Sequence, residues 1–296
     1  MEKILITGAS GFLGWNLCRF ARSAWDVFGV AFRNDIELQG VKIHRADLAK
    51  PGEAKKLLLE NRPDALIHAA AAADLNFCQM HRSESRKINV EASAVIASLC
   101  AEHSVRFVFI STDMVFDGLA APYREEDPVN PINVYGEQKA EAERLVFDKN
   151  PESIVCRMPL LFGDAGPTAK SFIQPMAKAM KEGREISLFT DEYRTPVSGR
   201  DAAKGIFLAL AKARGYLHLG GPGRVSRYDF GVLLRNVLNL PGAKLAPCSR
   251  QSIPMAAPRP RDVSFDSTKA EKLGFKPGDV MQELRELFAV PGGSPV

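Results

Sequence analysis

The feature that most constrains the fold is a glycine-rich turn close to the N-terminus. An apolar run at 3–7 leads into Gly8, Gly11 and Gly14, and a helical pattern begins at Phe12. Glycines so placed allow a tight strand exit, close approach of the backbone to a pyrophosphate, and close packing of helix on sheet. The helix N-terminus adds N–H groups and a positive dipole that favour phosphate. The turn predicts a nucleotide-binding unit, although its first gap is one residue longer than in the usual dinucleotide fingerprint.

Short apolar runs alternate with helical patterns through the first half of the chain. Such alternation is typical of parallel strands joined by right-handed helical crossovers, with ligands bound at the carboxyl ends of the strands. The sequence therefore predicts an α/β fold with a Rossmann-type doubly wound parallel sheet. The expected strands are 3–7, 27–32, 41–44, 65–68, 107–111 and 153–157, and the expected helices are 12–23, 52–61, 83–103 and 136–147.

The alternation weakens beyond Gly163, where Pro- and Gly-rich segments separate the remaining elements. We predict a mainly nucleotide-binding domain over 1–162, a smaller C-terminal substrate lobe over 163–290 with some interleaving, and a flexible tail over 291–296. The second half is expected to hold helices at 170–182, 201–212, 228–238 and 280–288 and short strands at 185–188 and 215–219.

A second motif, Tyr135-x-x-x-Lys139, lies downstream of the glycine turn. On a helix, residues four apart share one face, so the lysine ammonium is expected to lower the pKa of the tyrosine toward the working pH. A tyrosine tuned in this way is a suitable general acid. Together the two motifs predict hydride transfer to or from a carbonyl.

The end of the second predicted strand bears on cofactor choice. An acid there selects the free 2′-hydroxyl of NAD, whereas an arginine accommodates the 2′-phosphate of NADP. The chain has Arg33-Asn34, which favours NADP(H), while the nearby Asp35 leaves NAD(H) possible. Asp47-Leu48 is expected beside the adenine, and Asp47 is also a candidate cap for the helix that follows.

Composition excludes several other classes of protein. The formal net charge is only +4 and basic residues are interspersed with acids, which argues against nucleic acid as a partner. No apolar run is long enough to span a membrane, and no signal-peptide pattern opens the chain. Five cysteines without a Cys-x-x-Cys pair and five histidines without ligand spacing predict no metal site and a reducing cytoplasm. His68 is expected to pack near the cofactor.

Several motifs together resemble the extended short-chain dehydrogenases/reductases, and within them the dTDP-4-dehydrorhamnose reductase group. The resemblance covers Met1 to about Phe275. Its group-specific part is the Ser-Thr-Asp segment. The motifs are Thr7 to Gly14, Asp47-Leu48, His68-Ala69-Ala70-Ala71, Ser111-Thr112-Asp113-Met114-Val115-Phe116-Asp117-Gly118, Tyr135 to Lys139, and Arg259-Pro260-Arg261.

The resemblance implies a role for each matching position. Thr112 would hydrogen-bond the substrate ketone, Tyr135 would protonate it, and Lys139 would bind the nicotinamide ribose. Asn89 would be either a proton-relay residue or a buried hydrogen-bonding residue. The implied cofactor contacts are Gly8, Ser10, Gly11, Phe12, Leu13, Gly14, Arg33, Asn34, Asp47, Leu48, Ala69, Ala70, Ala71, Ser111, Tyr135, Lys139, Met158 and Pro159, and the implied substrate contacts are Thr112, Asp113, Met114, Arg194, Arg259 and Arg261.

The resemblance therefore implies an NADPH-dependent reductase of a nucleotide-activated 4-keto sugar. Each of the three implied substrate arginines has surface ion pairing as its alternative. Met114 and Leu160 replace aromatic residues common in the rhamnose enzymes, so the sugar stays open. Tyr123 to Asp127 and Arg259-Pro260-Arg261 also resemble the regulatory β subunit of methionine adenosyltransferase, which implies a non-catalytic NADP-binding alternative. A homodimer through the helices at 83–103 and 136–147 is a further possibility.

Overall fold

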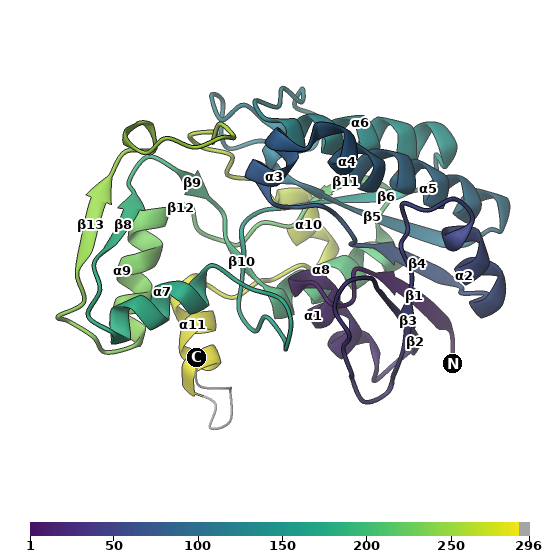
Figure 1. The fold of residues 1–296 in the computed structure, drawn as a ribbon, viewed down its shortest axis with the longest axis horizontal. Helices are drawn as coiled ribbons and strands as arrows, with labels where there is room; N and C mark the ends of the chain where they lie inside the picture. The colour runs from purple at the N-terminus through teal and green to yellow at the C-terminus, as the bar shows by residue number, and fades with distance from the viewer. Residues whose placement is uncertain (290–296) are drawn as a thin grey trace.

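A computed structural model describes residues 1–289 and contains a seven-stranded central sheet in the order β11-β6-β5-β4-β1-β2-β3 (Figure 1). Every neighbouring pair is parallel, which confirms the predicted doubly wound fold. The strands are β1 (Lys3–Thr7), β2 (Asp26–Ala31), β3 (Val41–Arg45), β4 (Ala65–His68), β5 (Arg106–Thr112), β6 (Ile154–Met158) and β11 (Gly215–His218).

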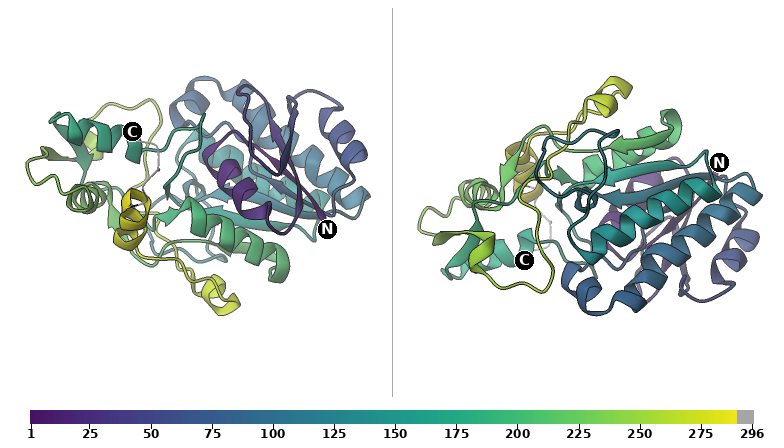
Figure 2. Two further views of the ribbon diagram at one scale, coloured as in Figure 1. Left: turned by 90° about the horizontal axis from the view of Figure 1, so that it is seen from below. Right: turned by 90° about the horizontal axis from the view of Figure 1, so that it is seen from above.

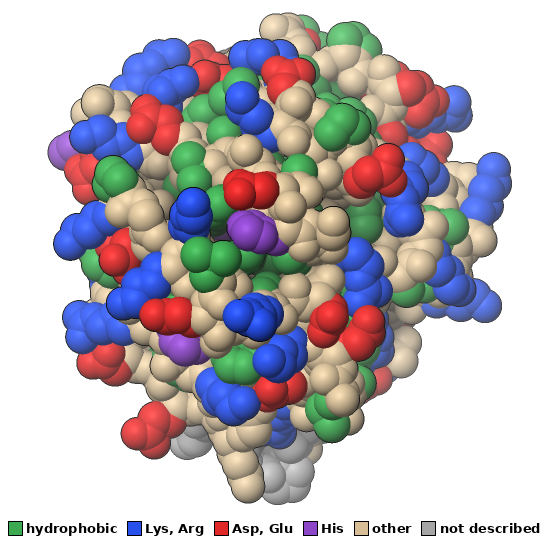
Figure 3. Space-filling view, turned by 90° about the vertical axis from the view of Figure 1, so that its right-hand side faces the viewer, with side chains coloured by type: hydrophobic (Ala, Val, Ile, Leu, Met, Phe, Trp, Pro, Cys, Tyr) green, Lys and Arg blue, Asp and Glu red, His purple; other side chains and the backbone are tan. Residues whose placement is uncertain are grey.

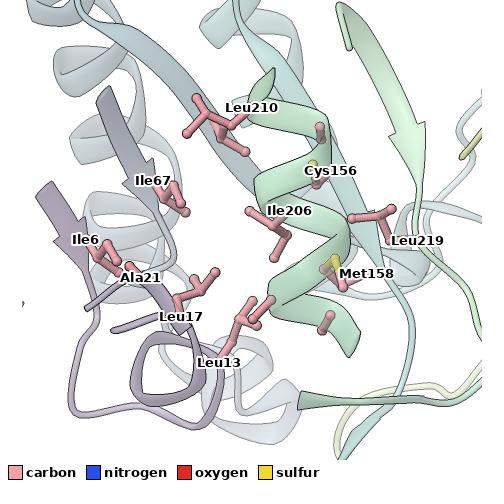
Figure 4. Close-up of a cluster of buried hydrophobic side chains, with 14 of the residues drawn as sticks. Ile6, Leu13, Leu17, Ala21, Ile67, Cys156, Met158, Ile206, Leu210 and Leu219 are labelled. Carbon is pink, nitrogen blue, oxygen red and sulfur yellow. The ribbon is translucent and has the colours of Figure 1, made fainter. Parts of the chain in front are cut away.

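Two helical layers cover the sheet. One layer holds α1 (Phe12–Ala21) and α8 (Gly199–Lys212), and the other holds α2 (Glu53–Asn61), α5 (Ala92–Glu102) and α6 (Val134–Lys149). In Figure 4 the apolar side chains of α1 and α8 point toward those of β1 and β4. Burying each such leucine or isoleucine contributes about 1.5–3 kcal/mol. Because alternate residues of a strand face opposite sides, Ile4 and Ile6 join the first layer and Leu5 the second.

The helix predicted at 83–103 is interrupted. The chain forms α3 (Leu75–Met80), α4 (Arg82–Arg86), a π-helical turn η1 (Lys87–Glu91) and then α5. Asn89 lies in this turn, fully buried, where it accepts a hydrogen bond from the Ala72 amide at 2.8 Å and donates to Gln138 Oε1 at 2.9 Å. Single π-helical turns of this kind occur inside α-helices, frequently at functional sites. Sequence periodicity alone does not reveal such a turn.

The smaller lobe, which lies beside the central sheet in Figure 2, has its own apolar core. It contains α7 (Ile173–Lys181), α9 (Arg227–Val237), α11 (Val280–Ala289) and the parallel pair β8 (Ile186–Phe189) and β13 (Leu245–Cys248). Short elements complete the chain: η2 (Asp113–Val115), β7 (Leu161–Phe162), β9 (Tyr193–Arg194), β10 (Val197–Ser198), β12 (Val225–Ser226), η3 (Arg250–Ser252) and α10 (Thr268–Leu273).

The two halves of the chain interleave. The strand expected at 215–219 becomes β11 at one edge of the central sheet, and α8 and α10 pack on this sheet as well. The tail expected at 291–296 lies outside the described residues. Within residues 1–289, no helix has the length and apolarity needed to cross a bilayer, and no three potential metal ligands cluster. Cationic and anionic side chains are interspersed over the face in Figure 3.

Candidate active site

The glycine turn forms a tight cradle at the carboxyl end of β1. Gly8 has φ +73°, and a Cβ atom built on it would lie 2.8 Å from the Ala70 nitrogen. A Cβ atom on Gly14 would lie 2.1 Å from the Gly8 carbonyl oxygen. Gly11 is the N-cap residue of α1 and supplies no side-chain cap, and the first turn carries no acidic residue. Open N–H groups beside a turn that excludes side chains fit a nucleotide pyrophosphate.

A buried hydrogen-bond chain fixes the end of β4 beside this cradle. Thr7 Oγ1 accepts from the Ala69 and Ala70 amides at 3.1 Å each and lies 2.7 Å from His68 Nδ1. The Thr7 proton therefore goes to Nδ1, which leaves Nε2–H to donate to Ser93 Oγ at 3.1 Å. Burial lowers the pKa of His68 to about 3. His68 is a neutral support behind the cradle.

Two arginines lie at the ends of β2 and β3. Arg33 is exposed, and its Nη2 atom lies 3.7 Å from Glu84 Oε1. Arg45 is a residue of this edge that no sequence motif indicated. Its Nε atom donates to the Phe32 carbonyl at 3.2 Å, and its Nη1 atom lies 3.4 Å from Asp35 Oδ1. Arg45 ends β3 and pairs in register with Ala31, two residues before Arg33, and the pattern of neighbouring parallel strands could have indicated this proximity. This edge carries two cations that suit a 2′-phosphate.

Asp47 does not cap the helix that follows it. Its Oδ1 atom accepts from the Ala49 amide at 3.1 Å, whereas the N-cap of α2 is Gly52 in a left-handed conformation. The capping alternative is therefore wrong, because the Asp47 side chain closes a local turn instead. Leu48 packs at the margin of the apolar layer under α2 and α5.

The three predicted catalytic residues lie on neighbouring elements. Thr112 ends β5, and Tyr135 and Lys139 lie on one face of α6. A Cβ atom on Gly136 would lie 2.1 Å from the Met114 carbonyl oxygen, so the first turn of α6 packs directly on the turn after Thr112. This close approach places Tyr135 beside Thr112. Across the sheet, Thr112 pairs in register with Met158, the last residue of β6, so the ends of both strands meet here.

Burial governs the protonation of Tyr135. It raises the pKa of the phenol, the negative charges of Asp113 and Cys78 raise it further, and the Thr112 hydroxyl lowers it. The expectation that Lys139 lowers the pKa of Tyr135 is therefore wrong for the protein without a bound cofactor. Tyr135 is therefore protonated at neutral pH, the state that a general acid requires before it transfers its proton.

The buried surroundings of Lys139 set its pKa. Its side chain is buried, its Nζ atom donates to the Ile110 carbonyl at 2.6 Å, and this atom lies 3.9 Å from the centre of the Phe109 ring. Burial lowers the pKa of Lys139 to about 7, while Glu143 raises it. An ammonium group in contact with a carbonyl and an aromatic face is held in place at the floor of the site.

Asp113 and Arg194 form a buried ion pair rather than a surface one. Arg194 Nε lies 3.2 Å from Asp113 Oδ2, and Arg194 Nη2 lies 3.4 Å from Glu192 Oε1. The Thr112 hydroxyl donates to Asp113 Oδ1 at 3.1 Å. Burial raises the pKa of Asp113 to about 6 although Arg194 opposes the shift. The surface alternative considered for Arg194 is thus wrong, because the lobe closes over it.

The Arg-Pro-Arg segment passes over the same region. Arg259 is partly buried, and burial lowers its pKa. Arg250 donates from Nη1 to the Arg259 carbonyl at 2.7 Å, and the two residues line an open cavity of about 190 Å³ with Ile132 and Met255. Arg261 is exposed. The cavity adjoins the site through Arg259.

Comparison with known proteins identifies the family of the chain. The RmlD substrate binding domain family matches residues 1–290. The chain belongs to this family. A structure described as a hypothetical dTDP-4-dehydrorhamnose reductase from Sulfolobus tokodaii is 33% identical, with a TM-score of 0.82 over 94% of this chain and 98% of that one.

Two curated relatives of this RmlD-family chain differ in role. Methionine adenosyltransferase 2 subunit beta from Bos taurus is 29% identical over 93% of this chain and 83% of the relative. A probable low-salt glycan biosynthesis reductase from Haloferax volcanii is 28% identical over 96% of each chain. A second solved structure, described as a dTDP-4-dehydrorhamnose reductase from Clostridium acetobutylicum, is 26% identical, with a TM-score of 0.84 over 97% of this chain and 99% of that one.

Proposed function

We propose that this protein is an NADPH-dependent reductase of a nucleotide-activated 4-keto sugar. The observation that carries the proposal is the packing of Gly136 on Met114, which brings Tyr135 beside Thr112 where β5 and β6 end. Two hydroxyl donors that converge at the mouth of a nucleotide cradle suit a ketone oxygen.

The residues fit a nicotinamide cofactor, which supplies a hydride to the ketone carbon when bound. The cradle at Gly8 and Gly11 would hold its pyrophosphate, Arg33 its 2′-phosphate and Lys139 its ribose. As negative charge builds on the ketone oxygen, the Thr112 hydroxyl would turn its proton from Asp113 Oδ1 to that oxygen, and Tyr135 would transfer its phenolic proton there. Donors aimed at this developing charge stabilise the transition state more than the ground state.

The relatives support a nucleotide-sugar substrate. The Sulfolobus structure and the Haloferax relative are both named as reductases, and the match to each spans more than nine-tenths of this chain. Met114 and Leu160 depart from the aromatic residues of the rhamnose enzymes, so the proposal specifies a 4-keto sugar nucleotide and leaves its sugar and base open.

A regulatory subunit is the second candidate. The bovine relative named as a methionine adenosyltransferase subunit favours it, together with the resemblance of the Tyr123 to Asp127 segment to the regulatory β subunit. In this case the nucleotide cradle would bind NADP without turnover. Both candidate functions are compatible with the presence of Thr112, Tyr135 and Lys139. Only the enzyme requires all three residues.

Substitution of Tyr135 tests the proposal. Tyr135→Phe keeps the ring and removes the hydroxyl, so reduction of a 4-keto sugar nucleotide should fall about 10²–10⁴-fold while NADPH still binds. Tyr216→Phe, on the edge strand β11, serves as the matched control and should retain full turnover. Equal turnover of the Tyr135→Phe and unmodified proteins would refute the assignment of the acid. Binding of NADPH without reduction of any keto sugar would favour the regulatory candidate.

A further inference from the structure

The Asn89 side chain uses both of its N–H donors inside the protein. Its Nδ2 atom donates to the Ala72 carbonyl at 3.1 Å and to Gln138 Oε1 at 2.9 Å, while its Oδ1 atom accepts from the Ala72 amide at 2.8 Å. The carbonyl of Asn89 accepts from the Ser93 hydroxyl at 2.9 Å. An asparagine amide has two N–H donors, and both are occupied here. The contacts favour the buried hydrogen-bonding role of Asn89.

Gln138, which directly precedes Lys139 on α6, extends this contact on the other side. Its Nε2 atom donates to the Arg82 carbonyl at 3.0 Å and to Ser85 Oγ at 2.9 Å, and the side chain is buried. Arg82 and Ser85 belong to α4, which lies beside α6 (Figure 1). Gln138 therefore joins α6 both to α4 and to the π-helical turn that holds Asn89.

The segment after β4 is held at several points by buried side chains. The Ala69 and Ala70 amides donate to Thr7 Oγ1 at 3.1 Å each. Both polar groups of the Ala72 backbone bond to Asn89. Residues 69–71 are among the expected cofactor contacts. A buried network whose donors and acceptors have partners is rigid, so the position of α6 is tied to that of this segment.

We propose that Gln138 is a positioning residue for the reaction. Through Asn89 it fixes the distance between α6 and the segment at 69–72, and so sets how the bound cofactor faces Tyr135. Hydride and proton transfer need aligned reacting atoms, and a displacement of about 1 Å costs about 10²-fold in rate. The effect of Gln138 on turnover rests on the proposed function, whereas its effect on cofactor binding does not.

Fluorescence titration with NADPH tests the effect on cofactor binding. Gln138→Met keeps the length of the side chain and removes its hydrogen bonds, so the dissociation constant for NADPH should rise about 3–10-fold, as for one lost hydrogen bond. Gln138→Glu keeps an oxygen that accepts from Asn89 Nδ2 and should stay within about twofold of the unmodified protein. Glu137→Gln is the matched control, because it breaks the Arg82–Glu137 contact of 2.5 Å, which joins the same two helices at the surface. This control should bind NADPH as the unmodified protein does.

Steady-state kinetics at saturating NADPH test the effect on turnover, with dTDP-4-dehydrorhamnose as the first keto-sugar nucleotide. Gln138→Met should lower kcat about 10–100-fold with little change in KM for the sugar nucleotide, because the reacting atoms are misaligned and the substrate contacts are kept. Asn89→Asp, which loses both Nδ2 donors, should show the same split between kcat and KM. The double variant should be no slower than either single variant, since residues that act through one contact are not additive.

The outcomes separate the positioning role from the proposed function. If Gln138→Met matches the unmodified protein in NADPH binding, kcat and KM, the positioning role is wrong, even where the variant has lost thermal stability. If the unmodified protein binds NADPH but reduces no keto sugar, the proposed function fails, and the NADPH titrations alone decide the positioning role. Should Gln138→Met not fold, weaker NADPH binding by Asn89→Asp together with normal binding by Gln138→Glu supports the proposal, and equal binding by these two variants overturns it.

Discussion

The Nε atom of Arg194 lies 3.2 Å from the Oδ2 atom of Asp113, and both side chains are buried. This ion pair joins β9, the strand that enters the smaller lobe, to the turn that follows Thr112. Removing one partner of a buried pair leaves an uncompensated charge, whereas its net contribution to stability is small when both partners are present. The pair therefore fixes the position of Asp113 more than it stabilises the fold.

Asp113 should make stability depend on pH. Burial raises the pKa of Asp113 from 3.8 to about 6. Its contribution to the free energy of unfolding is therefore fully present below about pH 4, where the carboxyl is protonated, and is lost as the pH rises through about 6. The free energy of unfolding of the unmodified protein, relative to Asp113→Asn, should fall by roughly 2–3 kcal/mol over this range. Urea unfolding of both proteins at pH 4, 5, 6 and 7 measures this difference. A difference independent of pH would contradict the buried, protonatable carboxyl.

The buried charge of Lys139 should lower the free energy of unfolding, although turnover requires this residue. Its pKa falls from 10.5 to about 7, so the penalty of burying its charge is largest at and below pH 7 and disappears as the pH rises to 10.5. Lys139→Met should raise the free energy of unfolding at pH 7 by roughly 1–4 kcal/mol and abolish most turnover. Lys149→Met, at the exposed end of the same helix, is the control and should change neither. A destabilised Lys139→Met protein at pH 7 would oppose this account.

Gly136 should tolerate no side chain. A Cβ atom would lie 2.1 Å from the Met114 carbonyl oxygen, so α6 must shift and move Tyr135. We expect Gly136→Ala to lose about 1–3 kcal/mol of stability, as overpacked sites do, together with most of its turnover. Gly242→Ala is the control, since its Cβ atom would meet nothing within 4 Å, and its stability should change by less than about 1 kcal/mol. Full activity of Gly136→Ala would show that the helix position does not matter.

Cofactor preference should depend on the arginines at the ends of β2 and β3. Arg33→Ala should weaken NADPH binding by about 1.5–3 kcal/mol and leave NADH binding unchanged, because only NADPH carries the 2′-phosphate. Arg45→Ala should have a smaller effect, since Arg45 also supports the Phe32 carbonyl. Lys42→Ala, at the opposite end of β3, is the control. Fluorescence titrations measure both dissociation constants, and equal values in the unmodified protein would exclude the proposed preference.

The sequence by itself determined the central sheet and the catalytic motif. Strand and helix periods are local properties of the chain, so β1 to β6 and the helix bearing Tyr135 and Lys139 lie where the pattern predicts. The glycine spacing likewise predicted a turn that side chains would block, because backbone conformation and close approach depend on the residue itself.

Only the tertiary structure decided how charges are shared within the site. Burial of Arg194 between Asp113 and Glu192 and the raised pKa of Tyr135 both depend on which distant segments meet. The same holds for β11, which follows the lobe segment in sequence but pairs with β6. Desolvation and Coulomb interaction depend on three-dimensional neighbours, and a linear pattern of residue types does not contain them.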